Sequence, residues 1–430
     1  MTISRVKSIL IVLLASLTVY QTGVLWFVNI TGGNFLMNYI PFMHQEVIPE
    51  GVSRLVKPKR IITVHVDGSF SVRYSGLEEL AAKRYGDMIL SQLLQSGNFI
   101  EAVSLNLDAS NLGASNLGAS DLDALDLSDG NEAFSYFLSG PAYIFEYAFP
   151  MEPEWFAAGY AERGSVLSAR VNTPFRQVII RPNDWAPIGG QIYPIVYFIG
   201  ENGYAYGFYT SLAYDEYFQE SFFNDAIVGA SDTGPSYIFQ PDAEFSGAFS
   251  FARDPDSIFF GVSVTNPYAD AHGGFSLNFI QDQVAVFFSN AGAIRPIVGS
   301  DVWVYRDVNT VVRYYDTHVL EYISYRAIDR SGTPSFVVDF AAAVQFIERD
   351  HLVINEFYLA DFRENNGQHV FYFGYVLGDA SLNLPNFPIV VTVDHGTVVR
   401  YTKTAFNFHT DEHVRLTGRE FDRLVRFILP

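Results

Sequence analysis

The chain contains no cysteine among its 430 residues. Disulfide bonds, thiolate nucleophiles and cysteine-ligated zinc or iron–sulfur centres are therefore excluded together. Basic residues are also scarce, because 27 Lys and Arg stand against 47 Asp and Glu, for a formal net charge of −20. Since affinity for nucleic acid comes mostly from Lys and Arg that neutralise phosphates, this balance argues against a nucleic-acid partner. Anionic lipid headgroups would repel the same acidic surface.

The signatures of common enzymes are missing as well. The sequence holds no P-loop, no dinucleotide-binding fingerprint and no nucleophile elbow. "SRVK" (4–7) matches S-x-x-K, but it precedes an apolar span and has no pocket in which to act. Acid/base catalysis by carboxylates needs a cleft and perturbed pKa values, which no spacing reveals. We therefore predict a protein that is not an enzyme, without catalytic residues, cofactor or metal.

One string keeps a metal-dependent hydrolase open as an alternative. "HTDEH", from His409 to His413, matches H-x-x-E-H, in which two histidines four apart on a helix bind zinc while Glu412 would activate water. The string lies between an expected strand and a terminal helix that Thr417 and Glu420 can cap, where a turn is favoured over a continuous helix. No third ligand is evident, so a solvated acidic loop is the preferred interpretation.

An apolar run near the N-terminus predicts a membrane anchor. Ser8–Val28 holds 21 residues without a charge, and at about 1.5 Å per residue such a helix spans a hydrocarbon core of about 30 Å. Arg5 and Lys7 precede the run and no other Lys or Arg occurs before Arg54, so the N-terminus is expected in the cytoplasm and the later domains outside it. A cleaved signal peptide is the alternative, but the run exceeds a typical h-region and no small-x-small cleavage site follows it.

Polar residues within this span are candidates for contact with partner helices. Thr18, Gln21 and Thr22 carry hydroxyl or amide groups, which form interhelical hydrogen bonds inside membranes. An equally good interpretation is that Tyr20, Gln21 and Thr22 simply approach the outer interface.

The rest of the chain has the pattern of an α+β protein with mostly antiparallel sheets and few helices. Asp67-Gly68 predicts a hairpin over 61–74, and a capping box at Ser75 and Glu78 begins a helix that Gly97 ends. An aromatic, strand-like pattern covers 141–159, and Asn202-Gly203 marks a second hairpin. We expect a cytoplasmic leader (1–7), a transmembrane helix (8–28), a juxtamembrane stalk (29–58), an N-terminal α+β domain (59–235), a middle α+β module (236–330) and a C-terminal helix-plus-antiparallel-sheet module (331–430).

The last hundred residues give the clearest pattern. Ser335 is placed to cap a helix that runs to about Arg349. Apolar residues recur there at helical spacing: Val337, Phe340, Ala341, Val344 and Ile347. Strands are expected over 354–362, 369–377 and 388–401, with turns at Asn365–Gly367 and at His395-Gly396, where turn chemistry also explains Asp394.

The middle module looks like a second copy of this plan. A helix is expected over 277–290, followed by strands that end in "TVVRYY", as the later unit ends in "TVVRYT". The shared letters are Thr310–Tyr314 and Thr397–Tyr401, which indicates an internal duplication.

These features together resemble a known family. The short basic N-terminus, the single span and three aromatic segments are similar to the YycH/YycI-type regulators of Firmicutes. The segments are "YIFEYAFPMEPEWF" (143–156), "NTVVRYYDTHVLEY" (309–322) and "VINEFYLADF…FYFGYVL…VDHGTVVRY" (353–401). The resemblance implies an N-terminal α+β domain and two PepSY-like modules in a single-pass protein of the bacterial cell membrane.

The resemblance also implies a function. Members of the family associate with a paralogous membrane regulator and with the essential cell-wall sensor histidine kinase, whose signalling they tune, and no catalytic residues belong to the family. The expected function is therefore modulation of a two-component sensor kinase through transmembrane and extracytoplasmic contacts. The alternatives are an extracytoplasmic module that binds wall polymer or peptide, and the hydrolase that "HTDEH" would serve.

Residues 106–130, "NLDASNLGASNLGASDLDALDLSDG", depart most from that family. Asn-Leu or Asp-Leu recurs about every five residues, which is typical of a stacked β-coil. With four pentapeptides to a coil, these 25 residues make little more than one turn, too few to bury a continuous core. We interpret the segment as an acidic, exposed insertion of low complexity.

Deletion of 106–130 is therefore predicted to leave the ectodomain stable. Because exposed segments contribute little to packing, the melting temperature should fall by less than about 2 °C. Thermal unfolding followed by circular dichroism of the two proteins measures this. A collapse of the melting temperature would show that the segment belongs to the folded domain.

Overall fold

The computed structural model describes the chain between Leu55 and Glu420, with gaps. Outside the described residues lie 1–54, 66–69, 75, 78–80, 105–140, 161–165, 183–193, 210–236, 242–248, 254–257, 269–276, 289–293, 331, 333, 378–379, 383, 385, 418 and 421–430. The predicted anchor and the insertion 106–130 are among them and stay predictions. No helix in the described part is both long and apolar enough to cross a bilayer.

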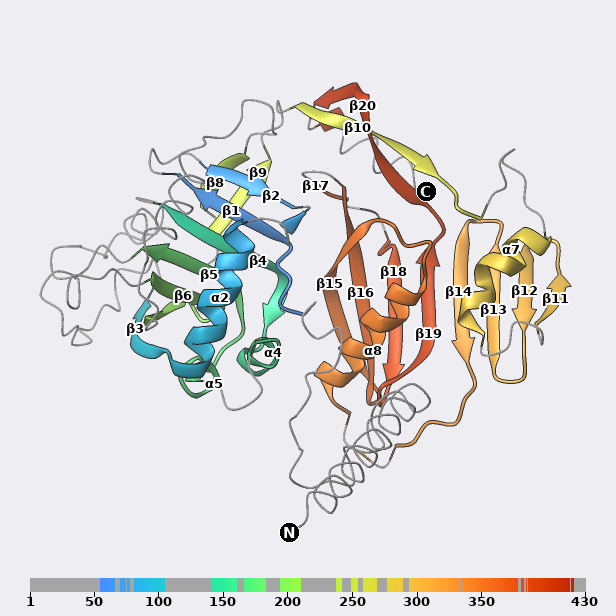
Figure 1. Cartoon of the computed structure of the whole chain (residues 1–430), viewed down its shortest axis with the longest axis horizontal. Coiled ribbons are helices and arrows are strands. Elements are labelled where there is room, and N and C mark those ends of the chain that lie inside the picture. Colours follow the sequence, from blue (N-terminus) through green and yellow to red (C-terminus); the bar gives the residue numbers. More distant parts are fainter. Residues whose placement is uncertain are drawn as a thin grey trace, which may run out of the picture. The chain divides into compact units, whose positions relative to one another are not determined.

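The N-terminal domain is built on a seven-stranded sheet with the order β2-β1-β4-β5-β6-β7-β3 (Figure 1). Its elements are β1 (Arg60–Val64), β2 (Phe70–Arg73), α2 (Ala81–Ser96), β3 (Asn98–Ser104), β4 (Ala142–Met151), α4 (Pro153–Ala158), α5 (Val166–Arg170), β5 (Phe175–Pro182), β6 (Pro194–Gly200) and β7 (Tyr204–Tyr209). All neighbouring strands are antiparallel.

Local signals predicted several of these elements. β1 and β2 pair as a hairpin, although the Asp67-Gly68 turn and the Ser75/Glu78 capping box lie outside the described residues. Helix α2 ends at Ser96, and Gly97 donates its N–H to Leu93 O at 2.6 Å. Gly203 joins β6 to β7 with a φ of 79°, which only glycine adopts readily. The pairing of β1 with β2, the end of α2 at Gly97 and the turn at Gly203 are confirmed, whereas the Asp67-Gly68 turn and the capping box stay predictions.

Two boundaries in this domain differ from the prediction. The strand-like pattern expected over 141–159 stops at Met151, and α4 begins at Pro153, because proline favours the first helical position and cannot donate to a strand ladder. The stalk was expected to reach residue 58, yet Leu55 and Val56 are already buried in the core. The folded domain therefore includes these two residues.

A second, nine-stranded sheet carries the C-terminal half of the described chain, with the order β11-β12-β13-β14-β19-β18-β16-β15 and β17 beside β16. Its strands are β11 (Arg295–Val298), β12 (Val302–Arg306), β13 (Thr310–Tyr315), β14 (Val319–Ser324), β15 (Glu356–Asn365), β16 (Gln368–Leu377), β17 (Ala380–Ser381), β18 (Ile389–Asp394) and β19 (Thr397–Thr404). The helices are α7 (Leu277–Val284), which continues as a 3-10 turn (Ala285–Phe287), and α8 (Phe336–Arg349).

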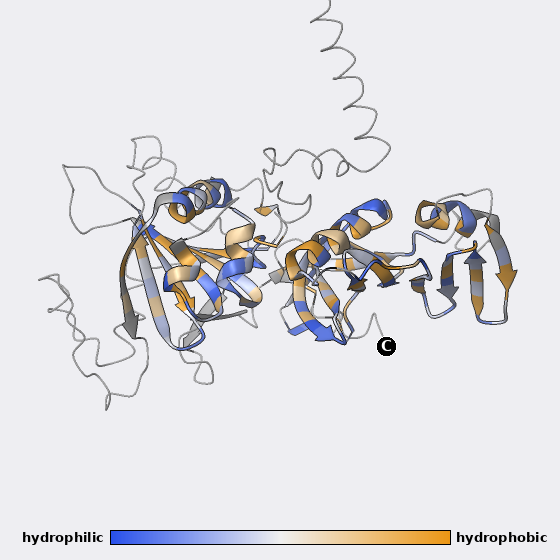
Figure 2. Cartoon of the chain, turned by 90° about the horizontal axis from the view of Figure 1, so that it is seen from below, coloured by the Kyte–Doolittle hydropathy of each residue, from blue (hydrophilic) through white to orange (hydrophobic). Residues whose placement is uncertain are grey.

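The middle and C-terminal modules share this sheet because β14 pairs with β19, with Tyr322 opposite Tyr401. We call this pairing the seam. Phe287 lies 5.7 Å from Phe346 of α8, and both rings contact Tyr322 and Tyr401. Both helices thus cover the same face of the sheet (Figure 2).

Each half of the sheet follows one plan, a helix and then a four-stranded antiparallel meander. α7 precedes β11 to β14, and α8 precedes β15, β16, β18 and β19. The matching "TVVRY" strings lie on β13 and β19, the third strand of one meander and the fourth of the other. They do not mark equivalent strands. In the first unit β14 follows the strand that carries the string, whereas β19 is the last strand of the second unit.

Helix α8 agrees with its predicted pattern. Ser335 occupies the N-cap position, although its hydroxyl makes no capping hydrogen bond. Of the five apolar positions predicted to face the core, Phe340, Ala341, Val344 and Ile347 are buried, whereas Val337 is only partly buried. The helix covers the sheet because these side chains pack against strands such as β16 and β18.

Two pairs of strands complete the described structure, β8 (Tyr237–Pro241) with β9 (Phe249–Arg253) and β10 (Ile258–Thr265) with β20 (Asn407–Thr417). The loop expected around "HTDEH" is therefore wrong, since these residues lie in β20. Asn355 holds this strand by a pair of hydrogen bonds with the backbone of Phe408, at 2.7 and 3.0 Å. Beyond it, Thr417 donates its N–H to Glu420 Oε2 at 2.8 Å and Glu420 donates its N–H to Thr417 Oγ1 at 3.4 Å, the reciprocal bonds of the predicted capping box. Residues 421–430 of the predicted terminal helix lie outside the described residues.

Candidate functional site

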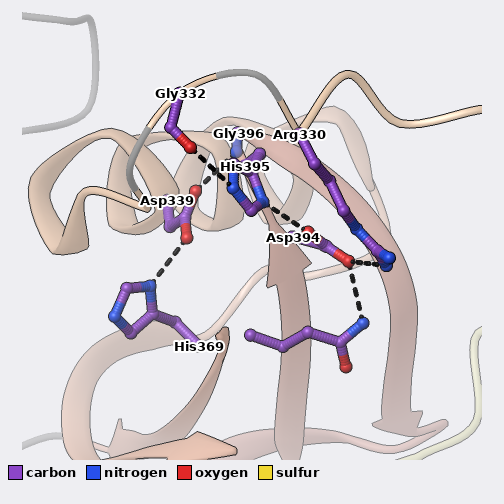
Figure 3. Close-up of polar contacts among 8 residues, drawn as sticks. Arg330, Gly332, Asp339, His369, Asp394, His395 and Gly396 are labelled. Carbon is purple, nitrogen blue, oxygen red and sulfur yellow. Dashed lines mark hydrogen bonds and ion pairs between the residues drawn. The ribbon is translucent and has the colours of Figure 1, made fainter. Parts of the chain in front are cut away.

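Polar side chains gather where α8 begins, beside the turn between β18 and β19 (Figure 3). We call this group the junction site and define it as Arg330, Asp339, His369, Asp394 and His395. Arg330 belongs to the segment that links the two halves of the sheet, and the other four come from α8, β16, β18 and the turn itself.

Asp339 is the centre of the first contact. Its side chain is 0% exposed, and a buried carboxylate is costly unless hydrogen bonds and charges surround it. Oδ2 lies 2.6 Å from His369 Nδ1, and Oδ1 accepts the N–H of Gly396. Asp339 also lies in the first turn of α8, where the positive end of the helix dipole stabilises a carboxylate.

His395 and Asp394 form the second contact. His395 Nδ1 lies 2.6 Å from Asp394 Oδ1, and Nε2 lies 3.1 Å from the carbonyl oxygen of Gly332. Arg330 Nη2 donates to Asp394 Oδ2 at 2.6 Å, and Gln368 Nε2 donates to the same oxygen at 3.0 Å. The hydrogen bond from Arg330 is the main cause that holds the pKa of Asp394 well below its ordinary value.

These contacts hold the backbone in place. His395 has a φ of 49° and Gly396 a φ of 75°, as a tight hairpin turn requires. Both ring nitrogens of His395 and both oxygens of Asp339 are already engaged, whereas a general base must reach a substrate proton. The junction site therefore fastens the linking segment to the second half of the sheet.

A second polar contact lies inside the core. Lys403 Nζ on β19 lies 2.6 Å from Asp350 Oδ2 at the end of α8, and the two side chains are 2% and 1% exposed. Tyr401 donates its O–H to the same oxygen at 3.0 Å, and Lys403 Nζ sits 5.3 Å from the centre of the Tyr268 ring. Burial lowers the pKa of Lys403, although the Asp350 carboxylate opposes that effect.

A third contact crosses the seam. Glu321 on β14 accepts hydrogen bonds from Arg313 Nη1 at 2.9 Å and Tyr315 Oη at 3.1 Å on β13, and from Arg400 on β19. Burial alone would raise the pKa of Glu321, but the Arg313 hydrogen bond and the Arg400 charge outweigh it, and the pKa is lowered. One carboxylate thus ties both halves of the sheet together.

The structure describes only some of the residues singled out from the sequence. Thr18, Gln21 and Thr22 lie outside the described residues. His409 Nε2 lies 2.8 Å from Thr265 Oγ1 on the neighbouring strand, and His413 is exposed. The register of β20 with β10 shifts between Asp411 and Arg415, where His413 donates its N–H to Asp411 Oδ1 at 3.0 Å. The string therefore does not form the helix on which histidines four apart share a zinc ion. Across the described ranges, no three His, Asp or Glu side chains are grouped closely enough to hold a metal.

Sequence reasoning missed the Asp339–His369 and Asp350–Lys403 pairs, although two signals were present. Asp339 interrupts the apolar stripe of the helix 336–349. His369 occupies the first buried position of β16, a strand in which partly buried and buried residues alternate at its start. Asp350 and Lys403 carry no such signal, because they are separated in the chain and meet only in the folded core.

Comparison with known proteins adds no relative, since no family model, no curated protein and no solved structure matches this chain. The class of protein is therefore defined by its own structure. It is an α+β protein of mostly antiparallel sheets in which two helix-and-meander units form one sheet.

Breaking the buried ion pair should be costly. Lys403→Met leaves the Asp350 carboxylate in the core without its counter-ion, so the free energy of unfolding should fall by about 3–5 kcal/mol. Urea unfolding of the wild type and the variant measures this. The double variant Asp350→Asn/Lys403→Met should recover part of the loss, because it removes the uncompensated charge.

The matched control is the exposed pair Arg176–Glu201, whose side chains are 38% and 39% exposed. Arg176→Gln should cost at most about 1 kcal/mol. Equal costs for Arg176→Gln and Lys403→Met would contradict the importance given to the buried pair.

The seam contact should make stability depend on pH. Since the folded pKa of Glu321 lies below the ordinary value of 4.5, its contribution is complete above that value and is lost as the pH falls through the folded pKa. Glu321→Gln should therefore lower stability near pH 7 and flatten the acid fall of the stability curve. Urea unfolding between pH 7 and pH 3 measures the slope, with the exposed Glu364→Gln as control. Parallel curves for wild type and Glu321→Gln would refute the assignment.

Proposed function

We propose that this chain is a single-pass membrane regulator that modulates a two-component sensor histidine kinase through protein contacts. Its predicted anchor is 8–28, and its partners are the kinase and a paralogous membrane regulator, as the resemblance to the YycH/YycI-type proteins implies. The domains after the anchor lie outside the cytoplasm and include the two PepSY-like modules. The chain catalyses no reaction in this role.

The observation that carries the proposal is that α7 and α8 lie on the same face of the nine-stranded sheet. Both helices cover one face, and among the described residues neither helix covers the opposite face of β13, β14 and β19, which we take as the binding surface. Among the residues that alternate onto this face are Val311, Arg313, Ile323, Arg400 and Thr402, and none of them is fully buried. Mixed apolar and arginine-bearing surfaces of this kind suit protein interfaces.

Such a surface supports regulation by binding. A kinase with two signalling states shifts its equilibrium only if the regulator binds the two states with different free energies. The open sheet face and the anchor helix are two separate places at which such a difference can arise. The seam keeps the residues of that face in one rigid array, because β14 and β19 are hydrogen-bonded neighbours.

The proposal predicts the result of a membrane crosslinking pulldown with the sensor kinase. Replacing Thr18, Gln21 and Thr22 by leucine removes the polar groups of the anchor, so recovered kinase should fall about threefold for each interhelical hydrogen bond lost. Ile323→Lys on the open sheet face should also lower recovery, because it puts a charge into an interface core.

The matched control for the anchor is the replacement of Val12, Val19 and Val24 by leucine, which preserves an apolar helix. Unchanged kinase recovery and unchanged signalling output in both test variants would contradict the proposal. Loss in only one variant would assign the contact to that part of the chain.

A further inference from the structure

The amine of the buried Asp350–Lys403 pair has fewer acceptors than an ammonium ion needs. An ammonium carries three N–H donors, but among the described residues Lys403 Nζ has one hydrogen-bond acceptor, Asp350 Oδ2 at 2.6 Å. The Tyr268 ring lies 5.3 Å from Nζ and attracts positive charge, yet it offers no lone pair. Burial lowers the pKa of Lys403 even though the Asp350 carboxylate opposes that effect. The neutral amine, which is a nucleophile, is therefore favoured.

The two oxygens of Asp350 have different partners. Oδ1 accepts the N–H of Leu352 at 3.2 Å, whereas Oδ2 accepts the Tyr401 O–H at 3.0 Å and lies beside Lys403 Nζ. Since a C–O bond measures about 1.2 Å, the carboxyl carbon is within about 4 Å of Nζ. Reacting atoms meet productively from about 3–3.5 Å. The amine is therefore close to the carbon, and each oxygen has a donor that suits one role.

The surroundings of the pair exclude water. The side chains of Asp350 and Lys403 are almost fully buried, and so are those of Tyr268, Tyr375 and Tyr401. Burial and, second, the charge of Asp350 raise the pKa of all three phenols, so each remains a protonated donor. Tyr268 Oη makes no hydrogen bond with any described residue. A dry site with protonated donors favours a reaction that releases water.

We propose that Lys403 and Asp350 condense to an intramolecular amide, an isopeptide bond between β19 and the end of α8. The ammonium gives one proton to Oδ2, and the neutral amine then attacks the carboxyl carbon. The N–C bond forms, the C–Oδ2 bond breaks, and Oδ2 leaves as water with a second proton from the nitrogen. The third proton stays on the amide, so the ion pair becomes one amide and one water.

Neighbouring groups assist both oxygens during this step. The Leu352 N–H faces Oδ1, where negative charge develops as the amine attacks. The Tyr401 O–H donates to Oδ2, the oxygen that leaves. Because the chain has no cysteine, a disulfide cannot supply a covalent link between these elements.

A second lysine–aspartate pair provides an internal control. Lys83 Nζ lies 2.7 Å from Asp87 Oδ1, which is as close a contact as that in the core. The Asp87 side chain, however, is 36% exposed, so water solvates the carboxylate and keeps it ionised. Condensation is therefore expected at Asp350 and Lys403 and not at this pair.

The intact mass of the full chain, purified in detergent and then denatured, tests the proposal. The wild type should be lighter than the uncondensed chain by about 18 Da, the mass of one water. Protease digestion and tandem mass spectrometry should find two peptides joined through Lys403 and Asp350. Lys403→Met and Asp350→Ala should each show the full mass calculated for the variant.

A tyrosine variant tests the chemistry while both reacting groups remain. Tyr401→Phe removes the O–H that faces the leaving oxygen, so the condensed fraction in freshly made protein should fall about fivefold. The control is Tyr305→Phe, at a buried tyrosine on β12 in the other half of the sheet, which should leave the condensed fraction unchanged. Circular dichroism melts check that each variant is folded.

A folded wild type with the full mass would overturn the proposal. A loss of water that maps to Lys83 and Asp87, or to a succinimide within a single peptide, would overturn it as well. The cost of Lys403→Met in urea does not separate an ion pair from an amide, whereas the mass does. Kinase recovery in the pulldown is a separate readout, so either proposal can fail alone.

Discussion

The hydrogen bonds between β14 and β19 are the constraint on which the C-terminal structure depends. They turn two helix-and-meander units into one sheet, and they place Tyr322 opposite Tyr401 beneath both helices. An antiparallel sheet can leave one face to solvent only if the other face is covered. Since Phe287 and Phe346 meet over the seam, one apolar layer serves both units, and on the opposite face Ile323 and Thr402 are only partly buried.

Charged groups mark the points where separate segments must meet. Glu321 joins β14 to β13 and β19, the Asp350–Lys403 pair joins the end of α8 to β19, and the junction site fastens the linking segment to the β18–β19 turn. A buried charge is stable only beside its partners, so each contact penalises any arrangement that separates them. Apolar packing supplies the cohesion of the core, and these pairs specify which strands lie together.

The two faces of the sheet have different chemistry and support different contacts. The open face mixes valine, isoleucine, threonine and arginine over several strands, which suits a broad protein interface. The helix-covered face holds a groove of about 210 Å³ beside the seam, lined by residues of α8, β14 and β19. A fold by itself does not define a function, and here the function is argued from the sheet face opposite the helices and from the predicted anchor.

Short-range patterns in the sequence determined the elements whose hydrogen bonds close within a few residues. The helix 336–349, the end of α2 at Gly97, the turns at Gly203 and His395-Gly396 and the Thr417–Glu420 cap all belong to this group. The tertiary structure alone decided the rest. β20 is a strand because β10, 144 residues earlier at the Thr265–His409 contact, offers it a partner, and the short strand β11 depends on β12 in the same way. Lys403 and Asp350 meet only after α8 has packed on the sheet that contains β19. A residue's own neighbours in the chain carry no information about a partner that arrives from far away, which is why the seam and the groove beside it could not be predicted from the sequence.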